Sequence, residues 1–241
     1  MSLRDDIDWV EVPAGQVLMG TPVAELDALC ERLRDLPVQR SWLLKECPRR
    51  TVDVAGFAMS RVPLTNEQYA RLAAALDLGF DTPVGPADEP VALPFPAAEQ
   101  LAGALAAETG QPVNLPTEAQ WERAARGDDA REYPWGEHFS TDLANIGEGS
   151  RGGTTPVGAY PRGAGPFGIL DLAGNLDEWT RSTYAPYPGA PAEVPAVETW
   201  ALDVHVTRGG GWNHQRDAAR CARRHGLYEP GPVGVRLVLG T

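Results

Sequence analysis

Lysine is almost absent from this chain. Lys45 is the only lysine among 21 basic residues, and the other twenty are arginines. A GC-rich genome favours arginine codons, and replacement of lysine by arginine is reported in some heat-adapted families. The composition therefore predicts a GC-rich source and is compatible with a thermophile.

Cysteine and histidine, the side chains that most often bind transition metals, are also scarce. The chain has three cysteines, Cys30, Cys47 and Cys221. An odd count without a short pairing motif excludes a disulfide scaffold, although a single Cys30–Cys47 bridge stays open beside the favoured alternative of free thiols. The four histidines are His138, His205, His214 and His225. No two of them are three or four residues apart, so the sequence contains no local histidine pair for a metal, and we expect scattered loop histidines.

Long apolar runs are missing as well. The first eight residues, Met-Ser-Leu-Arg-Asp-Asp-Ile-Asp, lack the apolar core of a signal peptide. No stretch is apolar over the length that a membrane span requires. The expectation is a soluble, cytoplasmic protein without a membrane partner.

Charge is unevenly distributed along the chain. The formal net charge is −12, yet residues 204–241 contain six arginines against Asp217 and Glu229. The rest of the chain is strongly acidic, which argues against a general affinity for nucleic acid. We expect most of the six arginines to pair with carboxylates of the acidic part, while an anionic ligand is the alternative.

Local patterns predict short strands and several helices. Residues 8–20 and 51–57 alternate as strands, and residues 22–36 and 97–108 have the spacing of apolar positions that helices show. Two capping boxes, in which a threonine and a glutamine three residues later exchange hydrogen bonds, predict helix starts at Thr65 and Thr117. From Tyr133 onward the pattern indicates loops and short strands.

Four motifs occur in a fixed order in the second half of the chain. They are Asn-Leu-Pro-Thr-Glu-Ala-Gln-Trp-Glu-Arg-Ala-Ala-Arg-Gly from Asn114, Gly-Pro-Phe-Gly-Ile-Leu-Asp-Leu-Ala-Gly-Asn-Leu-Asp-Glu-Trp-Thr from Gly165, Arg-Gly-Gly-Gly-Trp from Arg208 and Gly-Val-Arg-Leu-Val-Leu from Gly234. Together they resemble the formylglycine-generating-enzyme, or sulfatase-modifying-factor, family. The resemblance implies an α+β, C-type-lectin-like fold with short irregular strands, two or three flanking helices and many loops. It also implies one domain over residues 1–241, in which Trp121, Trp179 and Trp212 are core residues and Arg236 anchors the tail.

The paired cysteines of the family's copper-dependent oxidases have no counterpart. The resemblance places the first at His214 and the second near Ala219, and Cys221 is the only thiol nearby. Cuprous ion prefers paired sulfur ligands. The family's iron enzymes use three histidines from an additional helical domain. We therefore expect neither copper nor iron, and no catalytic residue is assigned.

Calcium is the metal that the resemblance favours. Family members bind it in the loop that matches residues 171–178. The implied ligands are the carboxylates of Asp171 and Glu178 and the backbone carbonyls of Gly174 and Leu176, oxygen ligands of the kind calcium takes. A loop closed by hydrogen bonds alone is the alternative.

The tail resembles the variable region of proteins that retroelements diversify. The framework of such regions matches residues 209–213, 219–224 and 234–236. The residues expected to contact a ligand are Asn213, His214, Arg216, Asp217, Ala218, Arg223, His225, Leu227 and Tyr228. All are types that mutagenesis of AAC codons can produce, whereas Gln215 and Glu229 are not. The variable region is placed at about residues 208–236, with Arg220, Cys221 and Ala222 pointing inward.

Two functions follow from these resemblances. The preferred hypothesis is a non-enzymatic binding protein whose carboxy-terminal surface is diversified by a retroelement and recognises an unknown ligand, expected to be a protein. The alternative is a metal-dependent oxidoreductase of the formylglycine-generating-enzyme family that uses copper or iron, or an undiversified binding module of that family.

Overall fold

The structure is a computed structural model that describes residues 6–79, 84–194, 204–225 and 232–240. Two residues of the expected binding surface, Leu227 and Tyr228, lie outside these ranges. The described part combines helices with short strands, as the sequence predicts.

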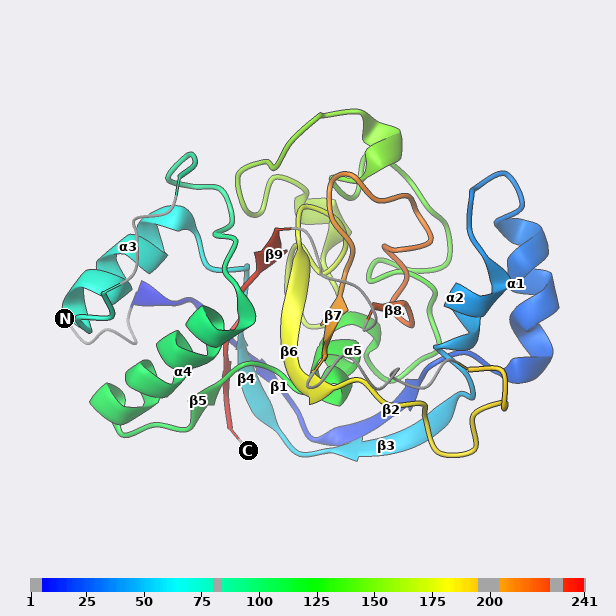
Figure 1. Ribbon diagram of the computed structural model, residues 1–241, viewed down its shortest axis with the longest axis horizontal. Helices are drawn as coiled ribbons and strands as arrows, with labels where there is room; N and C mark the ends of the chain where they lie inside the picture. Colours follow the sequence, from blue (N-terminus) through cyan, green and yellow to red (C-terminus); the bar gives the residue numbers. More distant parts are fainter. Residues whose placement is uncertain (1–5, 80–83, 195–203, 226–231, 241) are drawn as a thin grey trace.

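The strands form three sheets (Figure 1). A four-stranded sheet has the order β1-β4-β10-β5 and contains Trp9–Val12, Phe57–Ser60, Val238–Leu239 and Val113–Asn114. A ribbon pairs β2 with β3, which are Gly15–Met19 and Arg50–Val54. A second four-stranded sheet has the order β8-β7-β6-β9 and contains Arg224–His225, His205–Arg208, Asp177–Thr183 and Val233–Gly234. Within it only the β6–β9 pair is parallel.

The helices lie at the two ends of the molecule and behind its centre (Figure 1). They are α1 (Leu26–Arg32), α2 (Arg40–Leu44), α3 (Asn66–Ala75), α4 (Phe95–Thr109) and α5 (Glu118–Arg126). Figure 1 shows α3 and α4 at one end and α1 and α2 at the other, with β6 and β7 between them. Helix α5 packs against β6 and β7 and supports the central sheet from one side.

Both capping boxes are confirmed. Oγ1 of Thr65 accepts a hydrogen bond from the backbone of Gln68, and Oε1 of Gln68 accepts one from the backbone of Thr65. Thr117 and Gln120 make the same pair of bonds at the start of α5. These contacts use only neighbouring residues, which explains why the sequence predicts them well.

The region predicted as one helix over residues 22–36 is shorter. A 3₁₀ turn at Val23–Glu25 leads into α1, which ends at Arg32, and α2 follows as an unpredicted second helix. Pro37 disfavours helical geometry in Leu36, so the chain turns between α1 and α2 and no single helix spans this region. The two helices bury Leu26, Leu29, Leu43 and Leu44 against each other.

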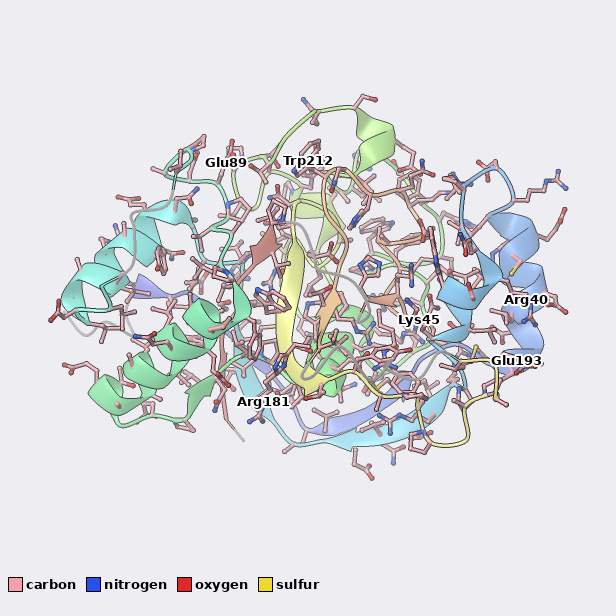
Figure 2. All side chains as sticks on the ribbon, in the orientation of Figure 1. Arg40, Lys45, Glu89, Arg181, Glu193 and Trp212 are labelled. Atoms are coloured by element: carbon pink, nitrogen blue, oxygen red, sulfur yellow. The ribbon has the colours of Figure 1, made fainter. Side chains whose placement is uncertain are left out.

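Two of the three tryptophans predicted in the core are buried. Trp121 is fully buried and Trp179 is 7% exposed. Trp212 is half-buried, so its assignment to the core is wrong. Figure 2 shows it near the upper rim of the molecule, where its backbone N–H donates to Asn175 O at 2.9 Å. The backbone of residue 212 therefore joins the scaffold while its ring does not fill the core.

All three cysteines are free, so the Cys30–Cys47 bridge is not formed. Within the described residues, none of the helices combines the length and the apolar character needed to cross a membrane.

Candidate functional site

Strand β6 separates two groups of polar side chains, because successive residues of a strand point to opposite faces. Glu178 lies opposite Arg208 of β7, which lies opposite Arg224 of β8. These three side chains share the face that packs on α5. There Arg208 pairs with Glu118 and Glu122 of α5, and Arg224 donates to Glu118 at 2.9 Å.

Glu178 is held on the same face by two other groups. Nε and Nη2 of Arg236 donate to its two oxygens at 2.8 and 2.6 Å, and the indole N–H of Trp121 donates to Oε2 at 2.7 Å. Glu178, Arg208 and Arg236 are all fully buried. The α5 side of the sheet is thus a closed ionic network.

The other face of the sheet brings Asp177 and His225 together. His225 lies opposite Thr207, which lies opposite Trp179, so these residues alternate with the network on the α5 side. Asp177 is two residues from Trp179 and therefore points the same way. Register alone thus places a carboxylate and an imidazole on one face of the central sheet.

The third member of the group, His214, comes from the turn that follows β7. This turn starts with three glycines, and Gly210 has φ 70°, a conformation that side chains with a Cβ rarely adopt. A Cβ at Gly210 would lie 2.7 Å from that of Ala218, so the turn has no room for another residue. The backbone N–H of Gly147 donates to His214 O at 2.6 Å and fixes the far side of the turn.

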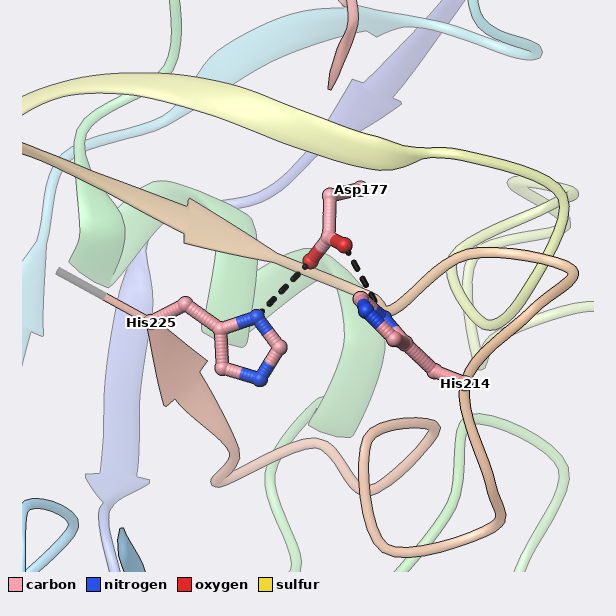
Figure 3. A group of neighbouring side chains, drawn as sticks. All are labelled: Asp177, His214 and His225. Atoms are coloured by element: carbon pink, nitrogen blue, oxygen red, sulfur yellow. Dashed lines mark ion pairs between the residues drawn. The ribbon is translucent and has the colours of Figure 1, made fainter. Parts of the chain in front are cut away.

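Figure 3 shows the resulting cluster of Asp177, His214 and His225. Nδ1 of His214 lies 3.1 Å from Oδ2 of Asp177, and Nδ1 of His225 lies 3.3 Å from Oδ1. One ligand atom from each residue lies within 4.8 Å of those of the other two. The imidazole rings meet edge to face, with centroids 5.3 Å apart. Asp177 is buried, whereas the side chains of His214 and His225 are 37% and 23% exposed.

The cluster perturbs the protonation of its members. Burial disfavours the ionised form of Asp177, but the neighbouring histidines outweigh it and hold the pKa of this carboxyl well below its usual range. The neighbouring carboxylate of Asp177 raises the pKa of His214. Burial lowers the pKa of His225. An ionised carboxylate beside two imidazoles can hold a divalent metal or a proton.

The expectation of scattered histidines is wrong for two of the four. His214 and His225 are eleven residues apart, and Asp177 precedes His214 by 37, so no local spacing reveals the group. The strand pairing of β6, β7 and β8 creates it. The one signal in the sequence was that His214 occupies the position that the resemblance gives to a metal-binding cysteine.

The expected ligand-contacting residues do not form one outward-facing surface. Asn213 is exposed and Arg216 is partly exposed, but Asp217, Ala218 and Arg223 are buried. Arg223 pairs with Asp217 at 3.3 Å and donates to Trp42 O at 3.1 Å, because α2 covers this part of the tail. Arg220, Cys221 and Ala222 point inward, as expected.

The expectation that tail arginines pair with carboxylates holds for the described residues. All six described tail arginines contact a carboxylate of the chain, and they are Arg208, Arg216, Arg220, Arg223, Arg224 and Arg236.

The loop predicted to bind calcium is closed by protein groups. Glu178 is neutralised by Arg236, and Oδ2 of Asp171 accepts from the backbone N–H of Gly158 at 2.6 Å. Gly174 packs so tightly that a Cβ would lie 2.2 Å from Asn145 O. An ion at this loop competes with Arg236 for Glu178, and calcium binding stays a prediction.

The residues present do not fit the family's cuprous site. Cys221 is fully buried, and its raised pKa of about 12, caused first by burial, keeps it a neutral thiol. The positions matching the two cysteines hold His214 and Ala219. A site of two imidazoles and a carboxylate lacks the soft sulfur ligands that copper(I) prefers.

Comparison with solved structures defines the class of fold. PvdO from Pseudomonas aeruginosa superposes with a TM-score of 0.76 at 25% identity, and covers 100% of this chain and 97% of its own. Variable protein 1 of Treponema denticola superposes with a TM-score of 0.67 at 17% identity, over 96% of this chain and 94% of its own. The fold is the C-type-lectin-like fold of the formylglycine-generating-enzyme type.

The chain belongs to the family of sulfatase-modifying factor enzyme 1-like domains, whose model matches residues 4–240. It is 32% identical to the hercynine oxygenase of Mycolicibacterium smegmatis over 84% of this chain and 54% of that protein. The chain therefore spans about half the length of this relative.

These relatives correct the preferred functional hypothesis. A non-enzymatic binding protein with a retroelement-diversified tail is wrong, because hercynine oxygenases are enzymes and the likeness to the Treponema variable protein extends to the fold alone. The burial of Asp217, Ala218 and Arg223 agrees with this correction. The oxidoreductase alternative fits the relatives better.

Proposed function

We propose that this chain is an oxidoreductase of the formylglycine-generating-enzyme family whose reaction centre is the cluster of Asp177, His214 and His225. The observation that carries the proposal is the convergence of these three side chains at the start of β6. His214 occupies the position that the resemblance gives to a metal-binding cysteine, so the reaction centre keeps its place in the fold while its ligands change.

The scaffold prepares the cluster for chemistry. The glycine turn fixes the backbone of His214, and the ionic network beneath β6 fixes Asp177 through the neighbouring residue Glu178. His214 and His225 are partly exposed, so a substrate can approach from their side. A rigid support of this kind keeps reacting groups within the narrow range of positions that catalysis requires.

The oxidant we propose is dioxygen, in keeping with the name of the hercynine oxygenases. A metal at the centre would supply the binding of dioxygen and the transfer of electrons to it from an organic substrate. Asp177, His214 and His225 would hold the metal, and the exposed edges of the two rings would orient the substrate. The substrates to examine first are hercynine and a peptide that contains cysteine.

Oxygen consumption tests the proposal. The protein, loaded anaerobically with iron(II), is mixed with each substrate in air-saturated buffer, and oxygen uptake and product mass are measured. We expect uptake that depends on substrate and falls at least about 100-fold in His214→Gln. His138→Gln is the matched control, because His138 is an exposed histidine outside the cluster. Equal oxygen uptake by the wild type and His214→Gln would show that His214 does not belong to the reaction centre.

Calcium binding by the loop 171–178 is a separate proposal. The carboxylate of Asp171 and the carbonyls of Gly174 and Leu176 would be its ligands, with Glu178 shared with Arg236. We expect millimolar calcium to raise the melting temperature of the wild type and not of Asp171→Asn, since an ion that binds only the native state stabilises it. Identical melting curves of the wild type in calcium and in chelator would show that the loop 171–178 does not bind calcium.

A further inference from the structure

We infer that Asp177, His214 and His225 bind one divalent transition-metal ion through two imidazole nitrogens and a carboxylate, with coordination positions left open on the exposed side. The inference specifies the ligands and the kind of metal at the centre of the proposed function, and it rests on that function only for the chemistry the ion performs. The cluster is a metal site in its own right, whatever substrate approaches it.

The two distances from the imidazoles to the carboxylate are in the range found between ligands of one ion. Imidazole nitrogens and carboxylate oxygens lie about 2.0–2.2 Å from a divalent metal. Two such ligands at about 95–105° from each other are then about 3.1–3.3 Å apart. The distances from Nδ1 of His214 and of His225 to the oxygens of Asp177 are 3.1 and 3.3 Å.

The hydrogen bonds of the cluster also leave room for a cation. Oδ1 of Asp177 is buried and accepts no hydrogen bond within the part of the chain that the structure describes. The backbone N–H of Gly211 donates to Nδ1 of His214 at 3.0 Å, so Nδ1 presents a lone pair to that donor. In that tautomer Nδ1 has no proton to give to Oδ2 of Asp177, 3.1 Å away. Two facing acceptors repel each other unless a cation joins them.

A proton on His214 is the alternative to a metal. An imidazolium would bridge His214 and Asp177, but it would leave Gly211 N–H facing a second N–H. A metal contacts all three side chains at once. It replaces only the hydrogen bond from Gly211 N–H to Nδ1 of His214. The two opposed N–H groups that a proton would leave, and the contact of one ion with all three side chains, favour the metal.

The donor set selects the class of metal. Two imidazoles and one carboxylate suit iron(II), cobalt(II) and zinc(II), and this set with open positions is the arrangement of non-haem iron oxygenases. The three protein ligands leave one or more positions of the ion unfilled, and the partial exposure of both histidines places these toward solvent. Iron(II) is the member of this group that reacts with dioxygen.

Cobalt(II) titration tests the site without reference to activity. Protein stripped of metal is titrated anaerobically, and the visible absorption of bound cobalt is followed. We expect one cobalt per chain and a loss of affinity of at least about 100-fold in each of Asp177→Asn, His214→Gln and His225→Gln. His138→Gln and Asp142→Asn, which change exposed residues of the same types, keep wild-type affinity. Melting curves of all variants show which of them are folded.

Nitric oxide tests the open position, since it binds iron(II) only where a coordination position is free. The iron(II) form should give the electron paramagnetic resonance signal of an iron–nitrosyl with spin 3/2. No cobalt binding, or equal binding by the folded triad variants, overturns the metal site, and bound iron without a nitrosyl signal overturns the open position. Metal binding without oxygen uptake leaves this inference intact and refutes the proposed function, so the two can fail separately.

Discussion

At the scale of single residues, Trp121 combines a buried ring with a buried hydrogen bond. Its ring is fully buried, and its N–H donates to Oε2 of Glu178 at 2.7 Å. Removing such a ring deletes a large apolar contact and also leaves a buried acceptor with one donor fewer. Trp212 lies near the rim and is half-buried.

The two tryptophans should therefore differ in their contribution to stability. We expect Trp121→Ala to lower the free energy of unfolding by about 3–5 kcal/mol and Trp212→Ala by about 1 kcal/mol. Urea unfolding followed by circular dichroism measures both. Equal losses would mean that the ring of Trp212 is packed as tightly as that of Trp121.

The three thiols should differ in reactivity. Burial raises the pKa of Cys47 to about 11 and that of Cys221 to about 12, whereas Cys30 is half-buried. Because the thiolate is the reacting form, at pH 8 only about one in a thousand Cys47 side chains is reactive, and fewer still of Cys221. Iodoacetamide at pH 8 should label Cys30 alone, and rising pH should add Cys47 before Cys221.

Peptide mass spectrometry reads the labelled positions, and denatured protein, in which all three thiols react, is the control. Labelling of Cys221 as fast as Cys30 at pH 8 would contradict the burial of this part of the tail.

Only part of the cluster of Asp177, His214 and His225 could be predicted from residue types and short spacings. The position of His214 follows from the motif that begins at Arg208, and Asp177 lies inside the motif that begins at Gly165. That the two meet, and that His225 joins them, depends on which strands pair and in which register. Hydrogen bonds between distant segments set that register, and they leave no local pattern in the sequence.

At the scale of elements, α5 and the central sheet are joined by buried ion pairs. Glu122 is fully buried and pairs with Arg208 and, one turn along its own helix, with Arg126. Arg208 also donates to the carbonyls of Cys221 and Arg223, at 2.7 and 2.8 Å. One carboxylate of α5 thus holds β7 and the tail in place.

Replacing this carboxylate should be costly. Glu122→Gln leaves two buried guanidinium groups with less negative charge around them, and we expect a loss of about 3–5 kcal/mol in the free energy of unfolding. Glu67→Gln is the control, because Glu67 pairs with Arg71 on the exposed side of α3 at 3.2 Å, and its loss should stay below about 1 kcal/mol. Denaturant unfolding of both variants measures these losses. Similar losses of unfolding free energy in the two variants would show that the buried ion pairs contribute little to stability.

The predicted elements that the structure confirms are those defined by contacts between residues close in the sequence. The two capping boxes need only neighbouring residues. The short strands β8 and β9, each two residues long, are formed by pairing alone and could not be read from the sequence. The helix α2 was missed for a similar reason, since its five residues are stabilised by packing on α1.

At the scale of the whole molecule, segments from both ends of the described chain share one sheet. Strand β10 lies between β4 and β5, and β4 also pairs with β1. We propose on this basis that residues 1–241 form one domain, and that heat unfolds it in one transition seen equally by tryptophan fluorescence and by circular dichroism. Two separated transitions would show that α1 and α2 form an independent unit. The melting temperature also tests the expectation of a thermophile.

The side chains of the neighbouring residues Asp177 and Glu178 lie on opposite faces of β6. Glu178 is paired with Arg236 in the core, and this buried contact holds the strand at the neighbouring residue Asp177 in place. His214, by contrast, is supplied by a surface turn. The two positions therefore differ in how freely they can be exchanged: a substitution at position 177 also disturbs the strand that carries Glu178, whereas a substitution at position 214 is the simpler way to change which ion the proposed site would accept.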